Sequence, residues 1–64
     1  MQSKLTLKNA RHLRGYTLKE VAQKLRISVK TLSRYERRPG ETPLHVAVIL
    51  ISLYQVPISL IDWR

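Results

Sequence analysis

Residues 17–36 read TLKEVAQKLRISVKTLSRYE, and this stretch predicts two short helices joined by a tight turn. Thr17 indicates the first helix start, because Thr is a favoured N-cap and Glu20 three residues later completes a capping box. Ser28, another favoured N-cap, indicates the second start. We expect a left-handed residue in the turn between them, as at many helix ends. Arg26 occupies that position, although glycine would adopt the conformation without a steric clash.

Apolar residues recur at helical spacing in both predicted helices. The apolar face of the first helix consists of Leu18, Val21, Ala22 and Leu25. The second helix, about residues 28–37, turns Leu32 and Tyr35 inward. Its opposite face carries only polar or charged residues, which are Lys30, Ser33, Arg34 and Arg37. Pro39 and Gly40 end this helix.

The sequence before this stretch predicts another helix, over roughly residues 3–14. Gly15 follows it and suits the left-handed position after a helix. The core candidates on this helix are Leu7, Ala10 and Leu13.

Two further helices are predicted after the stretch, which makes five in all. One covers residues 44–54, with Thr42 as N-cap and Pro43 as the first helical residue. Its β-branched residues favour a strand as the competing interpretation. Pro57 begins the last, short helix, which ends at about residues 61–63. The predicted fold is therefore an all-α, compact, five-helix domain.

Composition indicates one domain, residues 1–64, of marginal size. The chain holds no Cys, and its two His residues, His12 and His45, lie far apart in the sequence, so we expect no disulfide, no metal site and no cofactor. His and carboxylates are too few for a catalytic trio, which argues against an enzyme. No apolar run is long enough for a signal peptide or a membrane span, so we expect a cytoplasmic protein without a membrane partner.

Charge divides the chain into two halves. Residues 1–40 contain eleven Lys and Arg but only two acids, whereas residues 41–64 contain one Arg and two acids. A basic half joined to an apolar half predicts contact with a polyanion on one side and packing on the other.

Residues 17–36 resemble the helix-turn-helix of the Cro and phage-repressor family, also called xenobiotic-response-element-like regulators. Ala22 stands where that family places a small residue between the two helices. The flanking stretches LKNARHLRG and TPLHVAVILISLYQVPISLIDW are similar to its first and last helices. The resemblance implies a repressor-like domain with a helix-turn-helix at helices 2 and 3, and a salt bridge between Arg11 and Glu36. The alternative for this pair is two independent surface charges.

The sequence departs from the family pattern at several positions. Arg26 replaces the glycine of the turn, and Leu18 replaces a polar residue that often contacts DNA in the family. Arg38 and Gln55 stand where the family often has glycines just after helices.

The resemblance makes residues 28–37 the recognition helix. Such a helix places long polar side chains of its N-terminal half in the major groove, where Arg and Lys read guanine. We therefore expect base contacts from Lys30, Ser33, Arg34 and Val29. The alternative for Val29, which its place at the edge of the inward face favours, is a half-buried packing residue. The alternative for Lys30 and Arg34 is a solvated helix face, which the absence of Glu and Asp on that face disfavours.

Contacts to the DNA backbone are expected at the edges of this helix pair, from Thr17, Lys19, Ser28, Arg37 and Arg38. Arg37 is a second-choice base reader, because it lies further from the helix start.

The function expected is a sequence-specific double-stranded DNA-binding transcriptional regulator of a phage, plasmid or bacterium, most simply a repressor. One such module covers half a site, so a homodimer on a palindromic operator is expected, with recognition helices about 34–36 Å apart. The dimer interface is predicted in the apolar C-terminal segment, at Val56, Pro57, Ile58 and Trp63.

Two other functions stay open. The first is a protein-interaction module, such as an antitoxin or a bridging factor, which would hold its partner with the apolar segment 44–63. The second is non-specific RNA binding, although the basic half offers few aromatic residues for base stacking.

Overall fold

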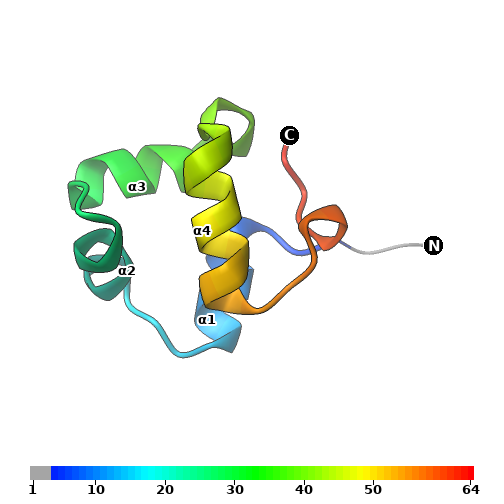
Figure 1. The fold of residues 1–64 in the computed structure, drawn as a ribbon, viewed down its shortest axis with the longest axis horizontal. Coiled ribbons are helices and arrows are strands. Elements are labelled where there is room, and N and C mark those ends of the chain that lie inside the picture. Colours follow the sequence, from blue (N-terminus) through cyan, green and yellow to red (C-terminus); the bar gives the residue numbers. More distant parts are fainter. Residues whose placement is uncertain (1–3) are drawn as a thin grey trace.

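The computed structural model describes residues 4–64, which form short helices and one isolated β-bridge. Its elements are α1 (Leu7–Leu13), α2 (Leu18–Leu25), α3 (Val29–Arg37), η1 (Pro39–Glu41), α4 (Leu44–Tyr54) and η2 (Ile58–Leu60), where η denotes a single turn of 3-10 helix. In Figure 1, α2 and α3 lie on one side of the molecule and α4 crosses in front of α1. The C-terminal segment returns on the other side, next to the start of the described chain.

The predicted fifth helix is wrong, because the described residues contain four α-helices and the last segment is only the 3-10 turn η2. The chain cannot continue as a helix there, since Ile61 adopts an extended conformation and pairs with Leu5. The Leu5 N–H donates to the Leu60 carbonyl oxygen at 2.9 Å, and the Asp62 N–H donates to the Leu5 carbonyl oxygen at 2.8 Å. Backbone pairing with the other end of the chain thus takes the place of helical hydrogen bonds.

The first helix is shorter than predicted. It begins at Leu7, because Thr6 is the N-cap and its side chain accepts a hydrogen bond from the Asn9 N–H at 3.0 Å. Residue 3, where the prediction began, lies outside the described residues. The assignment of Leu13 to the core is also wrong, since this side chain is 69% exposed.

Residues 44–54 form the helix α4 and not the competing strand. Thr42 does not cap this helix. Pro43 takes the N-cap position, with no side-chain hydrogen bond, and the Thr42 hydroxyl is buried without a hydrogen-bond partner among residues 4–64. Even α4, the most apolar helix of the described chain, is too short to cross a membrane, as are the others.

One core joins all four α-helices. It consists of Leu7, Ala10, Val21, Ala22, Leu32, Tyr35, Val46, Leu50, Tyr54 and Ile61. Leu32 and Tyr35 point inward as the sequence predicts, and Ala22 is small enough to lie buried in the contact between α2 and α3. The core therefore fixes the helix pair α2–α3 against α1 and α4.

Candidate nucleic-acid interface

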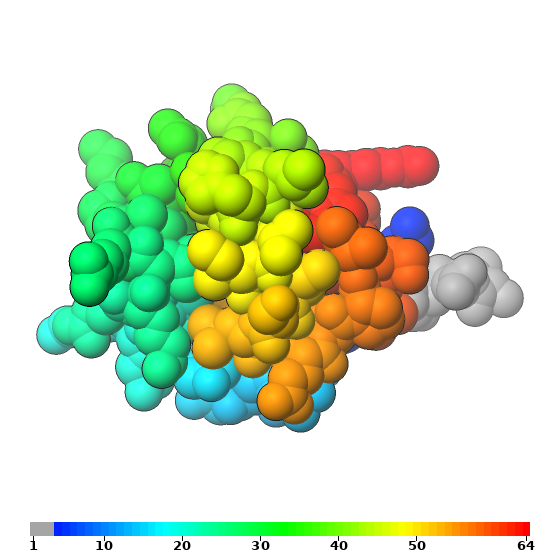
Figure 2. All heavy atoms as spheres, viewed as in Figure 1, coloured from blue at the N-terminus to red at the C-terminus, as the bar shows by residue number. Residues whose placement is uncertain are grey.

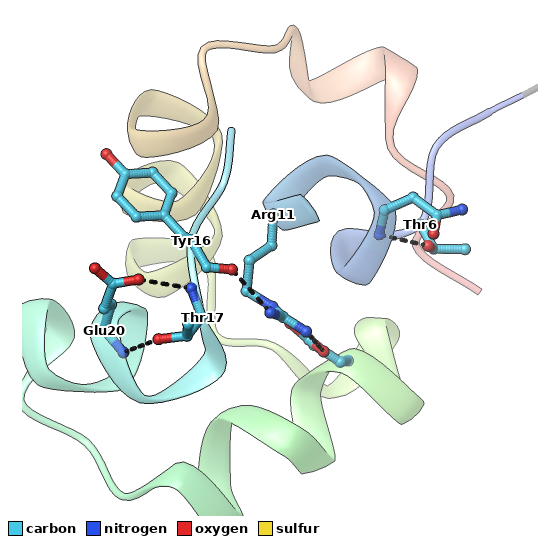
Figure 3. A network of polar contacts seen from close by, with 7 residues as sticks. Thr6, Arg11, Tyr16, Thr17 and Glu20 are labelled. Atoms are coloured by element: carbon cyan, nitrogen blue, oxygen red, sulfur yellow. Dashed lines mark hydrogen bonds and ion pairs between the residues drawn. The ribbon is translucent and has the colours of Figure 1, made fainter. Parts of the chain in front are cut away.

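The start of α2 is held by a capping box. Glu20 N–H donates to the Thr17 hydroxyl at 3.1 Å, and Thr17 N–H donates to the Glu20 carboxylate at 2.8 Å (Figure 3). The Thr17 backbone hydrogen bond is the main reason that the pKa of Glu20 is lowered from its ordinary value. The Thr17 N–H is thus already used, and only the hydroxyl hydrogen of Thr17 remains to donate to a phosphate. The backbone N–H groups of Leu18 and Lys19, in the first turn, have no acceptor within the helix and can also donate to a phosphate.

Arg26 adopts the left-handed conformation predicted for the turn, with φ 58° and ψ 42°. Its N–H donates to the Gln23 carbonyl oxygen, and the Ile27 N–H donates to the Ala22 carbonyl oxygen at 3.0 Å. This pair of bonds is a Schellman motif, which satisfies the last carbonyl groups of α2. The absence of glycine therefore does not prevent the turn from forming.

The two other positions where the family often has glycine after a helix, Arg38 and Gln55, differ in backbone conformation. Gln55 is left-handed, with φ 57°, as the family's glycine would be. Arg38 is not, since its φ is −133°. A side chain at Arg38 consequently carries no backbone strain.

The start of α3 is capped by Ser28, whose hydroxyl accepts from the Thr31 N–H at 3.0 Å and lies 2.8 Å from the Thr31 hydroxyl. This cap orients the first turn of α3, where Lys30 is exposed and Val29 is 43% exposed. Ser28 uses its hydroxyl within the helix cap, which limits what it can offer to a phosphate.

The side chains along the outer side of α3 form a basic face. Lys30, Arg34 and Arg37 are all exposed and are spaced at helical intervals on the same side. The Arg34 guanidinium stacks near the Tyr35 ring, 5.6 Å from its centroid. Ser33 lies at the edge of this face and is half-buried. The face holds no acid, and the one acid of α3, Glu36, is paired with Arg11 of α1, so the positive charge of the face is not compensated.

Arg11 ties α1 to α3 through the ion pair that the resemblance implied. Arg11 Nε lies 2.7 Å from Glu36 Oε2, and the two side chains are only 7% and 9% exposed. The same guanidinium donates to the Tyr16 carbonyl oxygen at 3.0 Å, which also fixes the loop before α2 (Figure 3). The buried charge pair thus joins α1, α3 and the loop before α2, and it holds α3 against the core.

Tyr54 of α4 is buried beside this pair. Burial raises its pKa well above the ordinary value, and the Glu36 carboxylate adds to the shift. The Tyr54 hydroxyl has no hydrogen-bond partner among the described residues. Its ring lies 6.4 Å from the Tyr16 ring, so α4 packs directly on the loop that Arg11 holds.

The residues predicted to contact the DNA backbone are all exposed, and they lie at the start of α2 and at the two ends of α3. Thr17 and Lys19 are at the start of α2, Ser28 is at the start of α3, and Arg37 and Arg38 are at the end of α3. Arg38 makes one long contact, 3.4 Å from a Glu41 carboxylate oxygen, and this exposed pair is weak. Arg38 therefore remains available to a phosphate.

The residues predicted for a dimer interface differ in exposure and in position. Ile58 and Trp63 line an open apolar groove of about 470 Å³, Pro57 is exposed, and Val56 is half-buried against the core. The groove is completed by residues that the sequence analysis did not assign to the dimer interface, namely Pro39, Gly40, Thr42, Leu44 and Ala47. A Cβ at Gly40 would lie 3.0 Å from the Trp63 carbonyl oxygen, so glycine allows the tail to approach η1.

Sequence reasoning also missed the role of Arg14. Its Nε donates to the Tyr54 carbonyl oxygen at 2.7 Å, and its Nη2 donates to the Gln55 carbonyl oxygen at 3.3 Å. This cation caps the C-terminal end of α4, whose last turn holds no basic residue of its own. The missing basic residue was the only indication in the sequence that a distant cation caps α4, and it did not identify Arg14 as that cation.

Within residues 4–64, no three His, Cys, Asp or Glu side chains gather as metal ligands would. The sequence model of a family described as Helix-turn-helix matches residues 7–61, from the start of α1 to the residue after η2. No curated protein and no solved structure matches the chain.

Proposed function

The chain belongs to the Cro and phage-repressor family of helix-turn-helix transcriptional regulators, and we propose that it represses transcription by binding a palindromic DNA operator as a homodimer. The observation that carries this proposal is the exposed basic face of α3, held in place by buried contacts on the opposite side of the helix. A rigid helix with uncompensated positive charge suits the major groove of duplex DNA.

In this proposal, Lys30 and Arg34 read bases, because both are exposed on the same face of α3, Lys30 in its first turn and Arg34 one turn further along. Either side chain reaches guanine O6 and N7, and Arg makes a bidentate pair there. Val29, with nearly half of its surface exposed, contacts a thymine methyl group. Ser33 has less exposed surface, so its contribution is smaller.

Phosphates are bound around this contact by Thr17, Lys19, Ser28, Arg37 and Arg38, all of them exposed. Neutralising six to eight phosphates per dimer predicts a slope of about −5 to −7 in log K against log salt concentration. Binding is therefore steeply salt-dependent.

The homodimer forms through the groove and the tail, with Ile58, Trp63, Pro57 and Val56 in the interface. The segment from residue 41 onward carries little charge, so two copies that meet there keep their basic halves apart. Ile58 is 45% exposed, so we expect a substitution there to leave the fold of the monomer intact. Ile58→Lys is expected to abolish cooperative binding to paired half-sites while leaving the helical content unchanged. Sedimentation that shows one monomer per bound site in the unaltered protein would contradict the dimer.

The experiment that tests the function is selection of bound sequences from a pool of random DNA duplexes. A palindromic consensus with half-sites one helical turn apart, about 34–36 Å, is the expected result. Enrichment of no sequence would refute sequence-specific binding. The same selection with Arg34→Ala provides the control, because it should alter the consensus at one position per half-site.

A further inference from the structure

Arg26 is held in a backbone conformation that lowers the stability of the fold. Its φ of 58° lies in the left-handed region, where a side chain with a Cβ clashes with the backbone and glycine does not. The cation at the C-terminal end of α2 offsets only part of this cost, because an exposed charge interacts weakly with the helix dipole. Residues held in such conformations cluster at functional sites, so an arginine at this position points to a function.

The folded chain gives the Arg26 side chain no partner. Within residues 4–64, the arginine side chains that donate hydrogen bonds are Arg11, Arg14 and Arg38, and neither ion pair includes Arg26. Neither of the two cation–π contacts there involves it, and its side chain is exposed. The Arg26 guanidinium is therefore available to a group outside the described chain.

The charges nearest to Arg26 in the sequence are also positive. Residues 21–35 contain no Asp or Glu, and they contain four cations, which are Lys24, Arg26, Lys30 and Arg34. Like charges repel one another, so Arg26 adds electrostatic repulsion to its conformational cost. An anion bound at this position offsets both.

Gln55, the other left-handed residue with a side chain in the described chain, differs in this respect. Its carbonyl oxygen accepts a hydrogen bond from Arg14 Nη2 at 3.3 Å, and the Tyr54 carbonyl oxygen accepts from Arg14 Nε at 2.7 Å. Among the described residues, the turn at Arg26 has only the backbone hydrogen bonds of its own Schellman motif. Gln55 is also uncharged, so contacts within the chain account for its conformation, whereas they do not account for an arginine at residue 26.

The turn at Arg26 lies beside the basic face of α3. In Figure 1 it lies at the outer edge of the molecule, next to the first residues of α3. Arg26 precedes the N-cap Ser28 by two residues and Lys30 by four, and all three are exposed. Figure 2 shows α2 and α3, in shades of green, along the left edge, whereas the start of the described chain and its C-terminal segment lie on the right. A polyanion that contacts the basic face therefore lies close to Arg26.

We propose that Arg26 binds a phosphate of the DNA backbone beside the start of α3. The inference rests on the proposed DNA binding, and it adds a contact that the turn glycine of the family cannot make. A planar guanidinium stays charged and donates two parallel hydrogen bonds to a phosphate. Because phosphates carry no base information, Arg26 raises the affinity for all duplexes alike. One residue thus lowers the stability of the fold and strengthens DNA binding.

The test compares Arg26→Gly with Gln55→Gly, because both variants relieve a left-handed conformation but only the first removes a charge. Both should raise the melting temperature. Arg26→Gly should nevertheless bind duplex DNA about fivefold less tightly per half-site at physiological salt, on the preferred sequence and on an unrelated one alike. Its slope of log K against log salt concentration should be shallower by about 1 per half-site. Gln55→Gly should keep the affinity and the slope of the unaltered protein, measured by fluorescence anisotropy of labelled duplexes.

A second control separates a local contact from a loss of net charge. Lys4→Ala removes an exposed cation from the start of the described chain, on the other side of the molecule from the Arg26 turn. Because salt screens distant charges, this variant should lose less than about twofold in affinity. A loss as large as that of Arg26→Gly would overturn the proposal, since net charge alone would then explain both variants.

Duplexes that carry one neutral methylphosphonate at a time identify the phosphate. At one position in each half-site, this substitution should weaken binding of the unaltered protein about fivefold but leave that of Arg26→Gly unaffected, because the losses of two groups in contact do not add. The absence of such a position would overturn the proposal and leave an acidic protein as the partner of Arg26. Unchanged affinity of Arg26→Gly, or a loss confined to some sequences, would overturn it too. If the unaltered protein bound no duplex, the proposed function itself would fail, and the first titration would show this separately.

Discussion

The two halves of the molecule are stabilised by different kinds of contact. The helices α1, α2 and α3 each begin with a hydroxyl cap, at Thr6, Thr17 and Ser28. Helix α4 begins without one, carries no charge and depends on Arg14, forty residues earlier, to cap its other end. The first half is thus specified locally and presents charge, whereas the second half is specified by distant contacts and presents apolar surface. We therefore propose nucleic-acid contact for the first half and protein contact for the second.

The largest effect is expected from breaking the buried ion pair of the basic half. Glu36→Ala leaves the Arg11 guanidinium buried without its partner, which should lower the free energy of unfolding by about 3–5 kcal/mol. Urea unfolding followed by circular dichroism measures this loss. The double variant Arg11→Met/Glu36→Leu is the control and should recover much of the stability, since no charge is then left unpaired. A loss below about 1 kcal/mol would mean that solvent reaches the pair.

The next effect separates base reading from phosphate binding within the basic half. Arg34→Ala should weaken binding to the preferred sequence by about 1–3 kcal/mol per half-site and relax base choice at one position. Arg38→Ala should weaken binding to all sequences alike and make the salt dependence shallower. Affinities for the preferred and for altered duplexes measure both effects. Equal losses on every sequence for both variants would show that Arg34 does not read bases.

A smaller effect compares left-handed residues in the two halves. Arg26→Gly removes a conformational cost of about 1–2 kcal/mol but loses a favourable cation at the end of α2, worth about 0.3–1 kcal/mol. The expected net gain is about 1 kcal/mol, with DNA sequence preference unchanged. Gln55→Gly, at the end of α4, is the matched comparison, because it relieves the same strain without removing a charge. Thermal unfolding measures both variants, and a destabilised Arg26→Gly would reveal a contact of this side chain that stabilises the turn.

The smallest effect concerns pH and the capping box of α2. The pKa of Glu20 is lowered in the folded protein by the hydrogen bond from the Thr17 N–H. The ionised carboxylate therefore stabilises the fold above its unfolded pKa, and this contribution is lost as the pH falls through the lower folded pKa. Glu20→Gln should melt below the unaltered protein at pH 7, and the difference in melting temperature should shrink towards pH 3. A constant difference across this range would show that ionisation of Glu20 does not contribute.

The same division between local and distant contacts explains what the sequence could predict. The caps at Thr17 and Ser28, the turn at Arg26 and the inward residues of α3 depend on neighbours within a few positions, and the structure agrees with them. The end of the chain depends on Leu5, which is remote in sequence, and there the predicted helix is only a 3-10 turn. Thr42 failed as a cap because the chain turns through η1 just before it.

In the candidate site, too, features set by sequence neighbours could be predicted, whereas features set by distant contacts could not. Exposure of Lys30, Arg34 and the flanking cations follows from helical periodicity, which the sequence contains. The groove beside Trp63 follows from the approach of the tail to Gly40, which no local pattern encodes. Contacts with DNA remain predictions from the family and from charge.

The bridge between Leu5 and Ile61 has a consequence for the order of folding. It joins positions separated by nearly the whole chain, so forming it requires closing almost the longest possible loop. The α2–α3 hairpin needs only a short loop and forms at far lower entropic cost. The helix pair that carries the basic face should therefore be assembled before the tail docks, and hydrogen exchange should reach the amides of Leu5 and Asp62 sooner than those in the middle of α2 and α3. Each molecule would then acquire its proposed DNA-binding surface first and its proposed dimer interface last.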